Sequence, residues 1–123
     1  MKMQLAMRCM LLVGQLAVVG VVHAHGALAI DGNKGAHYGW AVNYPSARAA
    51  REHAARQCGR KCNVVLTFSK GCGAYAASQS RGRNHQGWAH TRDGSSARHR
   101  AMRECHNRGG RECIVRVWGC TRH

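Results

Sequence analysis

The sequence predicts an α+β fold in which two repeated helix-strand halves pack on a mostly antiparallel sheet that disulfides stabilise. Three features predict it: an internal repeat, strand-like segments around two Ala/Arg-rich helices, and six cysteines beyond the N-terminal segment. A chain of 123 residues has room for one small domain. Because aromatic residues make up 6% of the chain and Phe occurs once, the core is expected to consist largely of small and aliphatic side chains.

The N-terminal segment, residues 1–24, has the anatomy of a secretory signal peptide. Lys2 and Arg8 supply positive charge, residues 9–22 are almost wholly apolar, and small or compact residues lead up to Ala24. The apolar run is short for a membrane-spanning helix of about 20 residues, so we expect cleavage rather than an uncleaved anchor. The protein is therefore expected to be secreted or periplasmic.

Cleavage after Ala24 leaves a single domain, residues 25–123, and a cut after Ala29 also fits the pattern. We expect no transmembrane segment in the mature chain, because no second hydrophobic run follows. Loss of Lys2 and Arg8 leaves 17 Lys and Arg against 5 Asp and Glu, so the mature chain is strongly basic.

An internal repeat organises the domain, because residues 39–76 resemble residues 87–123. Both stretches begin Gly-Trp-Ala and continue with a polar turn, an Ala/Arg-rich segment that ends in Cys, a second Cys, a β-branched run and Gly-Cys. Two copies are too few for a solenoid, so the halves are expected to close on each other about a pseudo-twofold axis. Trp40 and Trp88 occupy equivalent positions of the repeat, and Trp118 lies in a predicted strand. We therefore expect all three tryptophans to lie in the core.

The elements begin with two strands, at 26–31 and 36–43, around a Gly-rich turn at 32–35. A helix follows with Ser46 as a candidate N-cap. Small apolar residues recur along it at helical spacing and predict one stripe that allows close approach to a sheet. That stripe is Ala47, Ala50, Ala54 and Cys58.

The next strands are expected at 62–68, 72–77 and 85–90, with residues 78–84 as a loop. The second helix has Ser95 or Ser96 as its candidate N-cap, and the last strand covers 113–118. Its small apolar stripe is Ala97, Ala101 and Cys105. The resulting order is β-β-α-β-β-β-α-β, which is typical of an α+β domain.

The cysteines of an exported domain are expected to form three disulfides, although the sequence alone does not choose among the connectivities. The repeat suggests that two bonds tie each helix end to the next strand and that a third joins the two halves. The alternative is a zinc site whose ligands are the thiolates of the first two mature cysteines, four residues apart, and of one later cysteine. The candidate pairs are Cys58–Cys62, Cys105–Cys113 and Cys72–Cys120, and the zinc alternative uses Cys58 and Cys62 with Cys105 or Cys113.

The basic charge indicates the class of partner. Arg outnumbers Lys, and guanidinium groups bind phosphate and carboxylate in a bidentate manner. We expect an anionic polymer or lipid surface, or a protein partner, with a merely solvated basic surface as the alternative. No motif for sequence-specific nucleic acid binding is present, so a nucleic acid would be held through its backbone. The candidate anion-binding residues are Arg81, Arg83, Arg98, Arg100, Arg103, Arg108 and Arg111.

The histidines suggest chemistry without fixing its geometry. A ribonuclease-like phosphodiesterase needs two histidines and a cation around a phosphate, which His37 with His85 or His90 could supply. His99 and His106 are seven residues apart and could share a helical face. Solvated polar residues are the favoured interpretation, because no hydrolase, metalloprotease or P-loop motif is present. We therefore assign no catalytic residue, no metal ligand and no cofactor.

A copper site is a sharper alternative that depends on cleavage after Ala24. The free amine and imidazole of an N-terminal His25 could chelate copper together with a second histidine. This resembles the copper brace of polysaccharide monooxygenases, which the rest of the chain does not resemble.

A set of short motifs runs through nearly the whole mature chain. They are Gly26-Ala27-Leu28-Ala29-Ile30, Gly39-Trp40, Cys62-Asn63-Val64-Val65, Gly71-Cys72-Gly73-Ala74, Gly87-Trp88-Ala89 and Trp118-Gly119-Cys120-Thr121, with Ala50 and Ala54 leading to Cys58, Ala97 and Ala101 leading to Cys105, and Cys113. In order and spacing this set resembles the bacterial family labelled domain of unknown function 4189. The resemblance implies a small exported protein with paired cysteines, and it transfers no catalytic residue.

The sequence thus favours an exported, non-enzymatic binding module that contacts an anionic envelope or host component through an Arg-rich surface. One alternative is a small secreted enzyme, either a His/Arg-dependent phosphodiesterase or a copper-dependent oxidase. The other is a secreted effector or inhibitor module that binds another protein.

Overall fold

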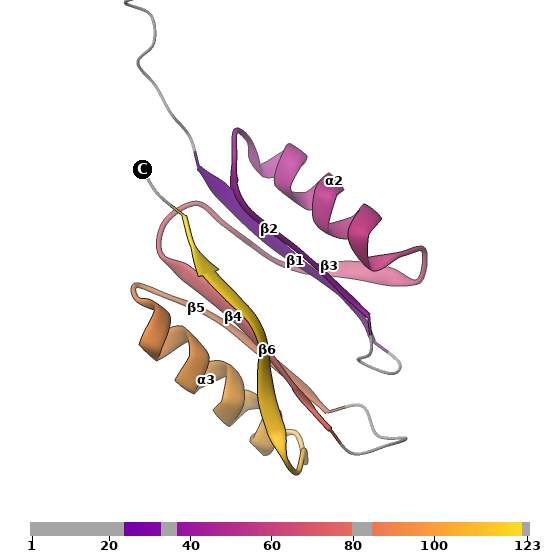
Figure 1. Cartoon of the computed structure of the whole chain (residues 1–123), viewed down its shortest axis with the longest axis vertical. Helices are drawn as coiled ribbons and strands as arrows, with labels where there is room; N and C mark the ends of the chain where they lie inside the picture. Colours follow the sequence, from indigo (N-terminus) through magenta and orange to yellow (C-terminus); the bar gives the residue numbers. More distant parts are fainter. Residues whose placement is uncertain (1–23, 33–36, 80–84, 122–123) are drawn as a thin grey trace, which may run out of the picture.

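A computed structural model describes residues 24–32, 37–79 and 85–121 of the chain. The expected order of elements is confirmed (Figure 1). In chain order the elements are β1 (His25–Asp31), β2 (Tyr38–Tyr44), α2 (Ala47–Cys58), β3 (Cys62–Phe68), β4 (Cys72–Ser78), β5 (Gln86–Thr91), α3 (Gly94–Asn107) and β6 (Cys113–Cys120).

The strands form two sheets, so the expectation of one sheet was wrong. In the described chain one sheet has the order β2-β1-β3 and the other β5-β4-β6, and all of these pairs are antiparallel. Residues 72–76, which the sequence repeat assigns to the first half, lie in β4 at the centre of the second sheet. The physical reason is that β1 and β4 are apolar on both faces, so each needs cover from two sides.

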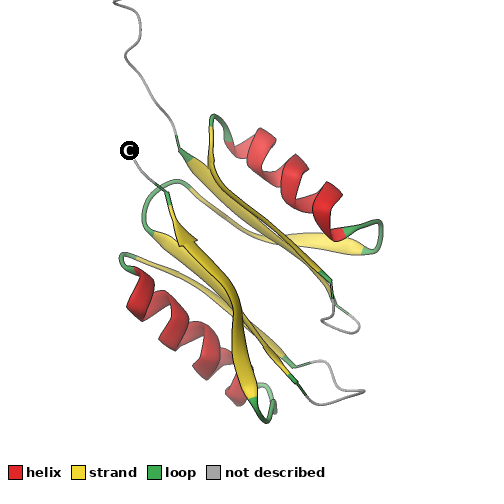
Figure 2. Ribbon diagram, in the orientation of Figure 1, coloured by secondary structure: helices red, strands yellow, loops and turns green. Residues whose placement is uncertain are grey.

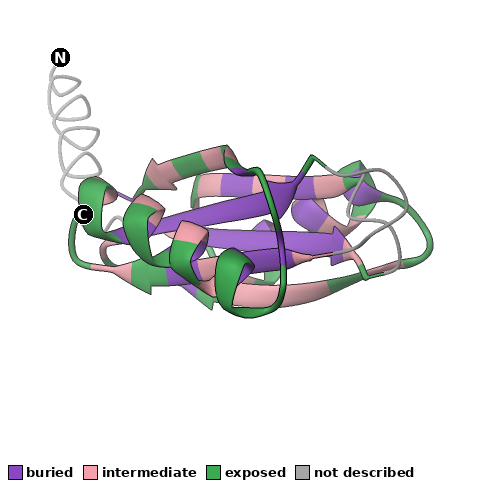
Figure 3. Ribbon diagram, turned by 90° about the horizontal axis from the view of Figure 1, so that it is seen from below, coloured by how far each residue is buried: buried purple, intermediate pink, exposed green. Residues whose placement is uncertain are grey.

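The layers run helix, sheet, sheet, helix, with α2 and α3 on the outside (Figures 1 and 2). Buried residues concentrate in the central strands (Figure 3). One apolar cluster lies under each helix, and a third joins Leu28 and Ile30 of β1 to Tyr75 and Ala77 of β4. The two sheets therefore share a common core between them.

Strand alternation sends small side chains toward each helix and larger ones toward the opposite sheet. Ala27 and Ala29 of β1 pack under α2, whereas Leu28 and Ile30 pack between the sheets. The repeated Gly-Trp motif follows the same rule. A Cβ on Gly39 would lie 1.8 Å from the Ala54 carbonyl oxygen of α2, so this glycine lets the helix backbone rest on the strand.

The helix ends are capped by side chains. Ser46 is confirmed as the N-cap of α2, where its hydroxyl accepts from the Ala49 N–H at 3.0 Å. The N-cap of α3 is Asp93, so the expectation of Ser95 or Ser96 was wrong. The Asp93 carboxylate accepts from the Ser96 N–H at 2.8 Å, and the helix therefore starts at Gly94, before either serine.

Three disulfides join the six cysteines of the described chain, and the pairs are those that the repeat suggests. Cys58–Cys62 and Cys105–Cys113 each tie a helix end to the following strand. Cys72–Cys120 joins the two repeated stretches of sequence as expected, and it does so between directly paired residues of β4 and β6 within one sheet. The zinc alternative is also wrong, because these sulfurs are bonded to each other.

The N-terminal segment bears on the export prediction. Residues 1–23 of the expected signal peptide lie outside the described part of the chain. Among the helices that the structure describes, none is long and apolar enough to cross a membrane.

Candidate functional site

The outer surface of α3 carries three of the seven arginines that the sequence nominates for anion binding, Arg98, Arg100 and Arg103. Ala97, Ala101 and Cys105 are buried against the second sheet. Since these residues form one stripe, the side chains between them face away from the sheet. The cationic or titratable residues on this outward surface are Arg98, His99, Arg100, Arg103 and His106.

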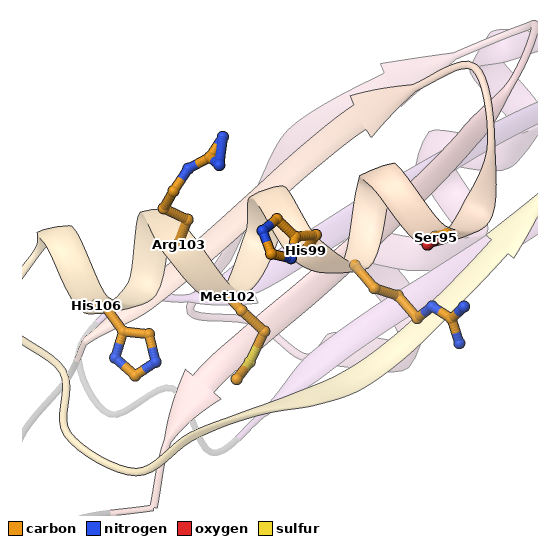
Figure 4. A pocket seen from close by; sticks show the side chains of 6 residues that line it. Ser95, His99, Met102, Arg103 and His106 are labelled. Carbon is orange, nitrogen blue, oxygen red and sulfur yellow. The ribbon is translucent and has the colours of Figure 1, made fainter.

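An open hollow of about 580 Å³ lies on this surface, within the size range of small-ligand sites. We call it the α3 hollow, and it is lined by Ser95, Arg98, His99, Met102, Arg103 and His106. Figure 4 shows Met102 and Arg103 leaving opposite sides of the helix, with His106 on the side of Met102. Met102 also packs on the buried cluster under α3. The hollow therefore combines a cationic rim with one apolar lining residue.

Arg98 stands out because its side chain is held from two directions. Its Cζ lies 4.3 Å from the ring centroid of Trp118, which places the guanidinium over the indole. Its Nε donates to the Gly94 carbonyl at 3.2 Å. Trp118 is 43% exposed, so its expected place in the core was wrong. It pairs with Ala74, whose side chain packs in the cluster under α3, and this register puts the indole beside the helix.

The remaining predicted arginines are not all in this hollow. Arg100 lines a neighbouring hollow with Thr91 and Ser96, and His99 and Arg103 border both. Arg108 stacks over Trp88 at 4.7 Å, beyond the end of α3. Arg111 lies exposed before β6. Two of the candidates, Arg81 and Arg83, lie outside the described residues.

Ion pairs do not neutralise the cations of α3 within the described chain. There the one ion pair joins Arg48 to Glu52 on α2, at 3.4 Å. Glu104 lies within α3 but forms no ion pair among the described residues, and the Asp93 carboxylate just before the helix caps it. Hydrogen bonds from Ser96 hold the pKa of Asp93 below its ordinary value. The positive charge of this surface is therefore available to a ligand.

The corresponding surface of α2 has a different character. Cys58 and Cys105 end the two apolar stripes, so counting back from them aligns the helices. Arg51 and Arg56 then match Arg98 and Arg103. At the positions of α2 that correspond to His99 and Met102, the residues are Glu52 and Ala55. The α2 surface thus has two matching arginines but also a carboxylate that pairs with one of its cations.

The histidines are distributed over several places. His99 and His106 both line the α3 hollow, as their spacing suggests. His85 precedes β5 and His90 lies near its end, where its ring stacks on Phe68 at 5.2 Å. His37, the expected partner of either one, directly precedes β2, which belongs to the other sheet.

In the part of the chain that is described, no group of three or more His, Cys, Asp and Glu residues could hold a metal ion. His25, the expected copper ligand, begins β1 and is paired with Tyr44 of β2.

Sequence reasoning did not find Ser95, Met102 or Trp118 as parts of the site. The sequence does contain a signal for Ser95 and Met102. Together with His99 and His106 they recur at steps of three or four residues, which follow one helix face. Trp118 is brought to Arg98 from β6, the strand after α3, and its spacing from the helix carries no such signal.

Comparison with family models gives one match. The family described as "Domain of unknown function (DUF4189)" matches residues 25–120. No curated protein and no solved structure matches the chain significantly.

Proposed function

Because the chain belongs to the DUF4189 family, whose description names no activity, we propose its function from its surface. We propose that it is an exported, non-enzymatic binding module that holds an anionic polymer of the cell envelope or of a host. The binding surface is the outer face of α3. Arg98, Arg103 and the two hollow histidines contact the anionic groups of the polymer.

The observation that carries the proposal is the clustering of unneutralised cations around one hollow. Arg98 and Arg103 line it together with His99 and His106, and none of the four has an ion-pair partner among the described residues. A single exposed cation binds an anion weakly, whereas a row of cations attracts a polyanion strongly. The rest of the fold supports the row, because a buried alanine stripe fixes α3 to the sheet.

The stabilisation of the fold supports export. Three disulfides close a domain whose core contains few large side chains, and such bonds persist in oxidising compartments. We also infer that β1-β2-α2-β3 and β4-β5-α3-β6 are two copies of one unit, since each has the same order of elements and strands. On this proposal the second copy carries the binding surface.

The test compares two double variants with equal loss of charge. Arg98→Ala with Arg103→Ala removes two cations from α3, and Arg51→Ala with Arg56→Ala removes two from the matching positions of α2. The disulfide-bonded protein and both variants are bound to a sulfated polysaccharide matrix and to anionic lipid vesicles. The salt concentration that releases each protein is measured.

The α3 variant is expected to leave the polysaccharide matrix at clearly lower salt than the α2 variant, because a polyanion responds to the local row of cations. Equal effects of the two variants would mean that net charge alone governs retention, and the proposed surface would be wrong. Strong binding to vesicles with weak retention on the matrix would replace the polymer with a lipid surface.

A further inference from the structure

We propose that Arg98 recognises a single oxyanion group on the polymer and that Trp118 is the residue that positions it. The group is a carboxylate, sulfate or phosphate, each of which accepts two parallel hydrogen bonds from a guanidinium. This inference rests on the proposed function, which needs only the charge of the α3 surface. The present inference adds that the orientation of the Arg98 side chain also determines binding.

The first step concerns how Arg98 is held before any ligand arrives. The stacking of its guanidinium on Trp118 fixes the plane of the group, and the hydrogen bond from Nε to the Gly94 carbonyl fixes its position along the helix. A free arginine loses considerable rotamer freedom when it binds an anion. An arginine that is already held loses less, so its interaction with the ligand is stronger.

The second step concerns what remains for a ligand. Nε is occupied by Gly94, which leaves the Nη donors of Arg98 for other partners. Arg98 is half-buried and lines the α3 hollow, where no described carboxylate forms an ion pair with it. Arg103 lines the same hollow and keeps the local potential positive. The Nη donors are thus suited to an anionic oxygen entering the hollow.

The third step is the contrast with α2. Arg51 occupies the position that corresponds to Arg98, seven residues before the stripe cysteine. The register partner of Ala27 on β3 is Thr67, whereas the register partner of Ala74 on β6 is Trp118. The first unit therefore has the arginine without the aromatic ring beside it. This makes Arg51 a matched control with the same charge and the same place on a helix.

The exposure of Trp118 fits a positioning role. Ile114 is the other large apolar residue of β6 that is exposed. It pairs with Ala77 of the inter-sheet cluster, so it lies on the face of the sheet opposite Trp118. The two do not form one apolar patch for a partner, and the neighbour that Trp118 contacts through its ring face is Arg98.

The experiment follows the arginine Nε–H signals and the backbone amide signals of α3 by NMR while inorganic sulfate, inorganic phosphate or glucuronate is added to the disulfide-bonded protein. The amide signals report binding in every variant, including one that lacks the Arg98 Nε–H. The variants are Arg98→Lys, which keeps the charge, Arg51→Lys as the matched control, and Trp118→Thr, which installs the residue of the first unit. Trp118→Phe is the conservative rescue. Thermal melts verify that each variant is folded.

For the wild-type protein we expect the Arg98 Nε–H signal to shift with at least one anion, and the anion with the tightest binding identifies the chemical group. Arg98→Lys is expected to weaken that binding about tenfold, the loss of roughly one charge-assisted hydrogen bond. Arg51→Lys is expected to leave it unchanged. Trp118→Thr should move the Arg98 signal and weaken binding, and Trp118→Phe should restore much of both.

Several results would overturn the inference. They are an Arg98 signal that responds to none of the three anions, Arg98→Lys binding that equals wild-type binding, or a Trp118→Thr variant with an unchanged Arg98 signal and affinity. If these occur while the α3 double variant still loses matrix retention, the proposed function stands and the orientation of Arg98 does not matter. If the double variant matches its α2 control, the proposed function fails separately.

Discussion

Gly39 of β2 lies directly against the carbonyl oxygen of Ala54 on α2. A Cβ on Gly39 would come within 1.8 Å of that oxygen, and a Cβ on Gly87 would come within 2.3 Å of the Ala101 oxygen on α3. The Gly of each Gly-Trp motif therefore sets the distance between helix and sheet. Helix α3, which carries the proposed binding surface, keeps its place through Gly87.

We expect Gly39→Ala and Gly87→Ala each to destabilise the protein by about 1–3 kcal/mol or more, because the added methyl collides with helix backbone rather than with a movable side chain. Gly32→Ala is the control, since a Cβ there meets no heavy atom within 4 Å. Denaturant unfolding of the three variants provides the measurement. A Gly39→Ala variant as stable as Gly32→Ala would contradict the close packing of α2.

The disulfides are expected to contribute unequally to stability. Cys72–Cys120 spans 48 residues and Cys58–Cys62 spans 4. In the loop-closure model their removal costs about 4 and about 2 kcal/mol respectively, because the longer loop restricts the unfolded chain more. Paired Cys→Ala variants at each bridge, compared by thermal melting under non-reducing conditions, test the order. A larger loss at Cys58–Cys62 would contradict it.

The cap of α3 predicts an acid-dependent loss of stability. Hydrogen bonds from Ser96 lower the pKa of Asp93 in the folded protein relative to the unfolded chain. This contribution is fully present above the unfolded pKa of about 4 and disappears as the pH falls through the lower folded pKa. We expect Asp93→Asn, which still caps a helix, to match the wild type near neutral pH.

Below about pH 4 the melting temperature of Asp93→Asn should fall less steeply than that of the wild type, because the asparagine does not titrate. Thermal melts between neutral and strongly acidic pH provide the comparison. Identical acid profiles for the two proteins would show that Asp93 does not carry this contribution.

Export and oxidation predict a defined mass for the protein made in its native host. We expect an intact mass that begins at His25 and gains six alkyl groups, one for each mature cysteine, only after reduction. Mass spectrometry before and after reduction and alkylation measures both features. A full-length mass with free thiols would contradict the export prediction and the disulfides together. A start after Ala29 would contradict the first sheet, because it would remove residues 25–29 of its central strand β1.

Much of the fold could be predicted because its signals are local. The Ala/Cys stripes, the β-branched runs and the Gly-rich turns identify helices and strands through side-chain spacing within a few residues. The N-cap of α3 was missed because Asp93 and the two serines after it are all good caps, and the preference among them depends on where the strand before the helix ends. The site could be predicted only in part for a similar reason. Arg98 and Arg103 are evident as a helical cluster, but Trp118 reaches Arg98 from the next strand, β6, through strand register that the sequence does not show.

The sequence by itself determined the order of elements and the basic character of the second helix, and its repeat suggested the cysteine pairs, because these depend on residue types and their spacing along the chain. Only the tertiary structure decided that the strands form two sheets, that Cys72 and Cys120 meet within one of them, and that the indole of Trp118 lies under Arg98. These outcomes depend on strand register and on which face of each sheet is covered. A shift of one residue in β6 would turn Trp118 to the other face of its sheet, and no pattern within the last strand alone sets that register.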